Sequence, residues 1–316
     1  MNSPAVFSPQ RHRGTEANSG PLISLLSFCI FTFAFCILHP PAHAASRVEC
    51  NAVRSAILKR SVRYCALLPA SYDAAKARRF PVLYYLHGLG ADEQSLVQSG
   101  GWSLVEGLQE EKRIGEFVII TPDGGRSFYI NSRDGRLRYE DFFIREFLPA
   151  VEKRYRIQAM RASRAIAGTS MGGYGALRFA FRYPQLFSAV SAHSAAVMEK
   201  LPQGAGQTPG LAGGSGGGIL GDVFGTPLDP AFYDRNNPLT LARATQNLAR
   251  LRIYFDCGRD DEYNFDAGAE KLNQTLASRR IPHEFHIYPG GHGWRYVAEH
   301  LDESLEFHSK AFGLTK

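Results

Sequence analysis

Short apolar runs alternate along most of the chain with longer segments of mixed polarity. Nearly continuous apolar runs are typical of strands buried on both faces of a parallel sheet, and apolar residues spaced by about 3.6 are typical of helices that cover it. The pattern predicts strands at 80–86, 116–121, 163–167, 187–191, 251–255 and 283–288, and helices at 102–112, 140–155, 174–180, 267–279 and 294–312. This alternation predicts an α/β fold with a mostly parallel sheet and helices on both faces.

Two further β-like runs, at 48–53 and 61–68, precede this series and are separated by a polar turn. If they pair as a hairpin, Cys50 and Cys65 come within one register step of facing each other. The spacing alone does not set the register, so a disulfide and two free thiols both stay open. Cys257 is expected to be free and buried.

The first 44 residues differ from the rest of the chain. Arg11 and Arg13 precede an apolar run at 22–38, and Ala42-His43-Ala44 offers a small-x-small cleavage site. This layout is typical of a secretory signal peptide, although the run is also close to the length of an uncleaved membrane anchor. We therefore expect a signal segment at 1–44 and a single catalytic domain at 45–316, located in the periplasm or secreted. Contact with a membrane is expected only if the first segment is retained.

Composition and charge mainly exclude classes of partner. The 316 residues are 44% hydrophobic and 21% charged, with a formal net charge of +6. The basic residues are interspersed with acidic ones, which argues against a nucleic-acid partner. Ten glycines between residues 204 and 225 predict an insertion without packed elements, either a surface loop or a lid over the substrate.

The clearest chemical signature is Gly168-Thr169-Ser170-Met171-Gly172. A predicted strand ends before the serine and a predicted helix follows it, which is the setting of a nucleophile elbow. Glycine on both sides allows the backbone to turn sharply and other segments to approach closely. Ser170 is therefore the predicted nucleophile.

A serine nucleophile needs a base, and the base needs an acid that orients it. After an elbow of this kind the acid and then the histidine follow along the chain. His292 lies in a glycine-rich loop after the last predicted strand and is the predicted base. Asp261 is the preferred acid, with Asp260 and Asp256 as alternatives after the preceding strand.

Backbone N–H groups are expected to bind the oxyanion of the reaction. Met171 follows the nucleophile and supplies one donor, and Leu89, in the turn after the first buried strand, supplies the other. His87 opens that turn and is expected to order it. His283 and His286 are three residues apart in a predicted strand, so they point to opposite faces and cannot share a metal. We predict no metal and no organic cofactor.

Taken together, these residues resemble the putative-esterase family of α/β-hydrolases, which includes S-formylglutathione hydrolases, feruloyl and acetyl-xylan esterases, enterochelin esterases and mycolyltransferases. The resemblance rests on segments 80–88, 122–125, 140–149, 168–173, 257–261 and 290–292. It implies an α/β-hydrolase fold and supports Asp261 as the acid and His292 as the base. It also marks Tyr129 and Asn131 as weak candidates for substrate contact. The Gly293-Trp294 pair after the histidine and the glycine-rich insertion depart from the family pattern.

The sequence thus predicts an exported serine carboxylesterase that forms an acyl-enzyme with a small-molecule, carbohydrate or lipid ester. An acyltransferase that passes the same acyl group to an alcohol is the alternative. A non-catalytic binding protein on the same fold is a remote third interpretation.

Overall fold

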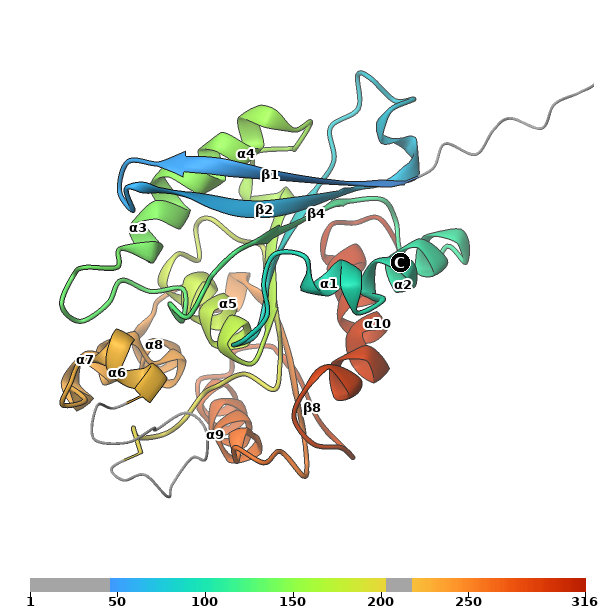
Figure 1. Ribbon diagram of the computed structural model, residues 1–316. Coiled ribbons are helices and arrows are strands. Elements are labelled where there is room, and N and C mark those ends of the chain that lie inside the picture. Colours follow the sequence, from blue (N-terminus) through green and yellow to red (C-terminus); the bar gives the residue numbers. More distant parts are fainter. Residues whose placement is uncertain (1–45, 203–217) are drawn as a thin grey trace, which may run out of the picture. The chain divides into compact units, whose positions relative to one another are not determined.

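An eight-stranded sheet in the order β1-β2-β4-β3-β5-β6-β7-β8 organises the residues that the structure describes (Figure 1). The computed structural model describes residues 46–202 and 218–316, so the predicted signal segment lies outside the described residues. The pairs β1–β2 and β2–β4 are antiparallel and the others are parallel. The strands are β1 (Arg47–Ser55), β2 (Arg60–Leu68), β3 (Val82–Leu86), β4 (Val118–Pro122), β5 (Arg164–Thr169), β6 (Ala189–His193), β7 (Arg252–Gly258) and β8 (Glu284–Tyr288). The predicted α/β fold is confirmed.

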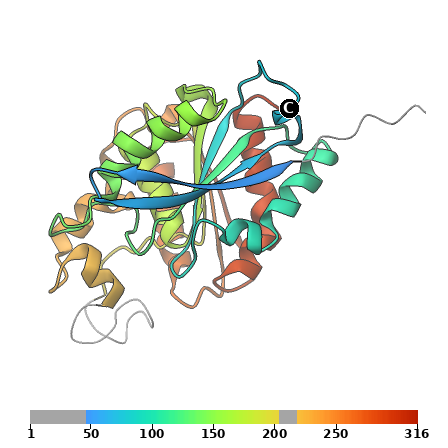
Figure 2. The same ribbon diagram turned by 45° about the horizontal axis from the view of Figure 1, so that its top comes forward.

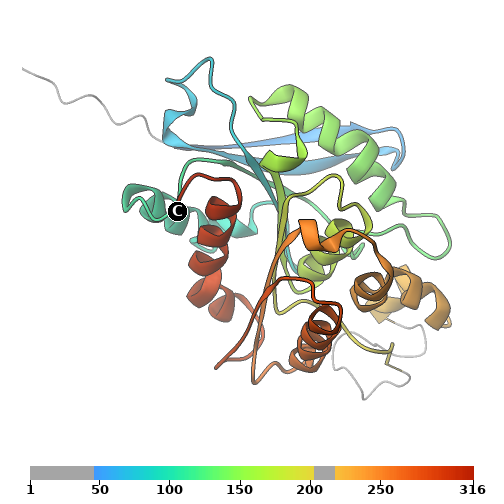
Figure 3. The same ribbon diagram turned by 180° about the vertical axis from the view of Figure 1, so that it is seen from behind.

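Helices cover both faces of the sheet (Figures 2 and 3). One face packs against α1 (Ser95–Gln98), α2 (Gly101–Glu110) and α10 (Trp294–Ala311). The other packs against α3 (Tyr139–Phe142), α4 (Leu148–Arg154), α5 (Met171–Arg182) and α9 (Phe265–Ser278). Three further helices, α6 (Gly218–Phe224), α7 (Pro230–Asn236) and α8 (Pro238–Ala244), belong to the same hydrophobic cluster, and α8 contacts α5 and α9. Successive strand residues point to opposite faces, so the continuous apolar runs supply both cores. Among the described helices, none is both long and apolar enough to span a membrane.

The helix predicted at 140–155 is interrupted in its middle. Phe143–Phe147 forms a π-helical turn between α3 and α4, in which the Leu148 N–H donates to the Phe143 carbonyl. Pro149 follows directly and has no N–H to continue the α-helical pattern. A single wide turn lets the helix continue across the proline while Phe143 and Phe147 stay buried.

The expectation that the glycine-rich segment forms no packed element is wrong at its C-terminal end. Gly218–Phe224 forms helix α6, and Leu220, Val223 and Phe224 are buried in the core. These apolar side chains offset the entropy that the glycines lose in a helix. Residues 204–217 lie outside the described residues, so the structure leaves the choice between surface loop and lid untested.

The hairpin of β1 and β2 resolves the alternatives for the cysteines. Cys50 and Cys65 are register partners and form a disulfide. Cys65 lies in β2 and is fully buried, whereas Cys50 lies in the edge strand β1 and is exposed. Cys257 is free and buried, as expected.

We expect loss of this disulfide to lower the free energy of unfolding by about 3 kcal/mol, because it closes a loop of 15 residues in the unfolded chain. The measurement is urea denaturation of the wild type and of Cys50→Ser, with and without reductant. Reductant should destabilise the wild type and leave Cys50→Ser unchanged. Equal free energies of unfolding for the wild type and Cys50→Ser in the absence of reductant would contradict the prediction.

The register brings four loops to one edge of the sheet. Leu86 of β3, Gly168 of β5 and Ala192 of β6 lie in one row across the sheet, and Gly258 of β7 pairs with Tyr288 of β8. The parallel strands therefore end together, and their following loops meet at the carboxyl edge. Ligands of open α/β sheets bind at this edge.

Candidate active site

Ser170 occupies the sharp turn between β5 and α5. Its φ of 54° and ψ of −116° place it outside the ordinary regions for a residue with a side chain. A Cβ on Gly172 would lie 2.0 Å from the Leu86 carbonyl oxygen, and one on Gly168 would lie 2.4 Å from the Gly172 carbonyl carbon. Only glycine fits at both places, which explains why the strained turn carries these residues.

The structure brings Ser170 together with the predicted base and acid. His292 Nε2 lies 3.0 Å from Ser170 Oγ, and His292 Nδ1 lies 2.8 Å from Asp261 Oδ2. The Asp261 side chain is fully buried, whereas the imidazole of His292 is 14% exposed. The alternative acids lie elsewhere, because Asp260 is exposed and Asp256 contacts His193 and Tyr296 inside the protein.

Backbone and side-chain donors hold the Asp261 carboxylate in place. Its Oδ1 accepts from the N–H groups of Tyr263 at 3.0 Å and Phe265 at 3.5 Å. Its Oδ2, which faces His292, also accepts from the Cys257 thiol at 3.5 Å. Burial and the neighbouring Asp261 raise the pKa of that thiol, so it stays a donor. The rings of Tyr263 and Phe265 meet the His292 ring edge to face and fix its plane.

Glu262 is a site residue that the sequence reasoning missed. Its Oε2 accepts from the backbone N–H of His292 at 2.7 Å, which ties the loop after β8 to the loop after β7. This hydrogen bond keeps the pKa of the Glu262 carboxyl below its usual value. The run of three acids beginning at Asp260 was the available signal, but nothing in the sequence distinguishes a loop clamp from a solvated carboxylate.

The turn after β3 lies beside Ser170, because a Cβ on Gly88 would lie 3.5 Å from Ser170 Cβ. His87 Nε2 accepts from the Gly124 N–H at 2.8 Å, so Nδ1 carries the proton and donates to the Gly88 carbonyl, also at 2.8 Å. Carbonyl and N–H of a trans peptide point in opposite directions, so the Leu89 N–H points away from the His87 ring. Neither that N–H nor the N–H of Met171 donates to an acceptor within the described residues. His87 orders the turn, as expected.

Tyr129 and Asn131, the weak candidates for substrate contact, both make hydrogen bonds within the protein. Tyr129 is fully buried, and its hydroxyl donates to the His87 carbonyl at 3.0 Å. Its ring lies against Gly124 and Gly175, where a Cβ would clash. Asn131 accepts from the Asp141 N–H. Tyr129 supports the turn after β3 from its buried side. A positive φ of 58° at Tyr129 directs its side chain inward.

A buried ion pair anchors the helix that follows Ser170. Arg178 of α5 lies 2.7 Å from Glu140 of α3, and its guanidinium also donates to Asn236 at the end of α7. Burial alone would raise the pKa of the Glu140 carboxyl, but Arg178 and Arg182 beside it hold that pKa below its usual value. The pair therefore fixes α5, and with it the elbow, against two other elements.

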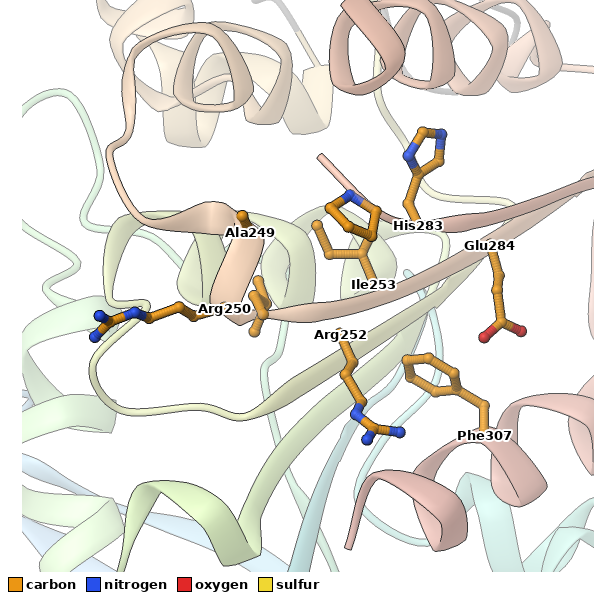
Figure 4. Close-up of a pocket in the computed structure, with 9 residues that line it drawn as sticks. Ala249, Arg250, Arg252, Ile253, His283, Glu284 and Phe307 are labelled. Carbon is orange, nitrogen blue, oxygen red and sulfur yellow. The ribbon is translucent and has the colours of Figure 1, made fainter. Parts of the chain in front are cut away.

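A cavity of about 380 Å³ opens beside Ser170 and His292. Another, of about 450 Å³, lies at the opposite end of the sheet where β7 and β8 begin. Figure 4 shows Arg250 pointing away from Arg252 and Glu284. His283, which precedes β8 rather than lying in it, bonds to Asn273. The cavity at Ser170 is lined by the serine itself and by His292, whose imidazole is in turn bound to the buried Asp261.

A parallel sheet with a strained serine at its carboxyl edge, and a histidine and an aspartate on the following loops, defines the α/β-hydrolase class. The chain belongs to the putative esterase family, whose model matches residues 55–308. An esterase of Mycobacterium tuberculosis is 33% identical over an alignment of 257 residues, and the match covers 75% of this chain and 53% of that protein. The chain therefore spans about half the length of that relative.

Two further relatives match over most of their own length. An acetyl esterase of Caldicellulosiruptor saccharolyticus is 25% identical over 266 residues, which cover 81% of this chain and 96% of that protein. The solved structure of a ferulic acid esterase superposes with a TM-score of 0.72 at 27% identity, covering 85% of this chain and 99% of the other. The family assignment thus covers the part of the chain that carries Ser170, Asp261 and His292.

Proposed function

We propose that the protein is a serine carboxylesterase in which Ser170 is the nucleophile, His292 the base and Asp261 the orienting acid. The observation that carries the proposal is the unbroken contact from Asp261 through His292 to Ser170 at the mouth of a cavity. The names of the related proteins support ester bonds as the target.

In the first step Ser170 Oγ attacks the ester carbonyl carbon while its proton passes to His292 Nε2. The N–H groups of Leu89 and Met171 bind the developing oxyanion. The bond to the alcohol then breaks, His292 gives its proton to the departing alcohol, and the acyl group stays on Ser170. Water repeats the sequence through His292, which releases the acid and restores the hydroxyl. Asp261 accepts from Nδ1 throughout and stabilises the imidazolium.

We further propose that the protein acts outside the cytoplasm. The layout of residues 1–44 supports export. The disulfide between Cys50 and Cys65 also supports it, because disulfides persist in oxidising compartments.

The test is active-site labelling combined with turnover. The protein should hydrolyse p-nitrophenyl acetate, and a fluorophosphonate should stop the reaction and leave its adduct on Ser170, located by peptide mass spectrometry. An adduct elsewhere, or activity that survives complete labelling, would refute the assignment. An acyl-enzyme that persists in water until an alcohol is added would favour acyl transfer instead.

A further inference from the structure

The cavity at Ser170 has a wall formed by one aromatic side chain. Trp294 is the first residue of α10 and lies two residues after His292. Its Nε1 donates to the Ser99 carbonyl at 2.8 Å, in the turn between α1 and α2. A Cβ on Gly101 would lie 3.1 Å from Trp294 Cη2, so the far edge of the indole rests on the start of α2. The ring is thus held at both ends and spans from the His292 loop to α1 and α2.

The lining of the cavity carries neither a carboxylate nor a lysine or arginine among its described residues. Three of its polar side chains have partners inside the protein: the Tyr85 hydroxyl and Thr169 Oγ1 lie 2.7 Å apart, and Ser95 Oγ bonds to Asp92. The remaining surface includes Leu89, Leu96 and the Trp294 ring. A charged group placed there would lose its hydration without gaining a partner, which disfavours it strongly.

We propose that this cavity is the acyl subsite of the enzyme, that it takes an uncharged apolar acyl group, and that the indole of Trp294 limits the length of that group. The proposal rests on the esterase function above. The acyl group stays bound to Ser170 after the alcohol has left. We therefore assign the cavity beside Ser170 to the acyl group rather than to the alcohol.

The length limit is tested with p-nitrophenyl esters from acetate to octanoate, comparing the wild type with Trp294→Ala and Trp294→Phe. Removing the indole should raise the octanoate-to-acetate ratio of kcat/KM by about tenfold or more, since a few extra methylenes would then fit. Trp294→Phe loses the bond to Ser99 but keeps most of the wall, so its ratio should stay close to that of the wild type. A third variant, Ala91→Leu, fills the cavity and should shift the preference toward acetate.

The charge preference is tested on a matched pair of substrates. Wild-type kcat/KM for p-nitrophenyl butyrate should exceed that for p-nitrophenyl hemisuccinate, of similar length but with a terminal carboxylate, by at least about tenfold. Similar values for the two esters would overturn the uncharged subsite.

Two outcomes separate this inference from the proposed function. If the wild type hydrolyses none of the esters, the esterase assignment itself fails. If it hydrolyses them but neither Trp294→Ala nor Ala91→Leu moves the chain-length ratio, only the role of the cavity fails. A shift seen with a series of acetates of increasing alcohol length, rather than with the acyl series, would also overturn the acyl subsite.

Discussion

The Ser170→Ala variant is expected to lose hydrolysis of p-nitrophenyl acetate almost completely, with kcat lowered by about 10⁶-fold. The alanine removes the hydroxyl that we propose forms the acyl-enzyme, while binding of the ester and the oxyanion donors stay in place. The residual rate should come from these groups acting on water. Steady-state kinetics with protein free of contaminating esterases measures the change.

The chain offers an unusual control for this experiment. Ser304, His193 and Asp256 form a second series of contacts, with His193 lying 2.8 Å from both the Ser304 hydroxyl and the Asp256 carboxylate. All three are buried, and Ser304 Oγ donates to the Leu301 carbonyl. Its proton is therefore not directed to the histidine, and no substrate can reach it.

Ser304→Ala should retain kcat within about twofold and lose only about 1 kcal/mol of stability from the missing hydrogen bond. A Ser304→Ala variant that is as inactive as Ser170→Ala, while remaining folded, would contradict the assignment of the nucleophile. Serine, histidine and aspartate at hydrogen-bonding distances therefore do not make a catalytic site where all three are buried.

Much of the fold follows from local patterns. Strands buried on both faces appear as apolar runs, so their positions could be predicted within a few residues. The order of the strands in the sheet could not be predicted in this way, because the placement of β4 between β2 and β3 depends on which faces the helices cover. The disulfide stayed open for a similar reason: one register step decides whether Cys50 and Cys65 face each other or point to opposite sides.

The candidate site was predictable to the extent that its chemistry requires a fixed chain order and glycine at close approaches. Ser170 and His292 satisfy both requirements, and burial distinguishes Asp261 from its exposed neighbour Asp260. Contacts across distant loops leave no such signal. The bond from His292 to Glu262 and the support that Tyr129 gives to the turn after β3 both depend on tertiary placement.

Asp261→Asn is expected to lower kcat by about 10⁴-fold while the protein stays folded. The amide oxygen would keep accepting from the N–H groups of Tyr263 and Phe265, which hold Oδ1 in the wild type. The amide nitrogen would then face His292 Nδ1 as a donor, so the ring must offer a lone pair there. Its proton moves to Nε2, and the ring can no longer accept the proton of Ser170.

Asp260→Asn is the matched control, because this neighbouring carboxylate is exposed and the substitution is chemically identical. It should keep kcat within about twofold. Thermal unfolding of both variants separates loss of catalysis from loss of structure. If Asp261→Asn retained a tenth or more of the activity, or if Asp260→Asn were the more damaging change, the tautomer of His292 would not depend on Asp261 and the acid would have to be reassigned. The predicted ratio of about 10⁴ between two adjacent, isosteric substitutions therefore tests how Asp261 acts, since a general effect of charge in this loop would lower both variants alike.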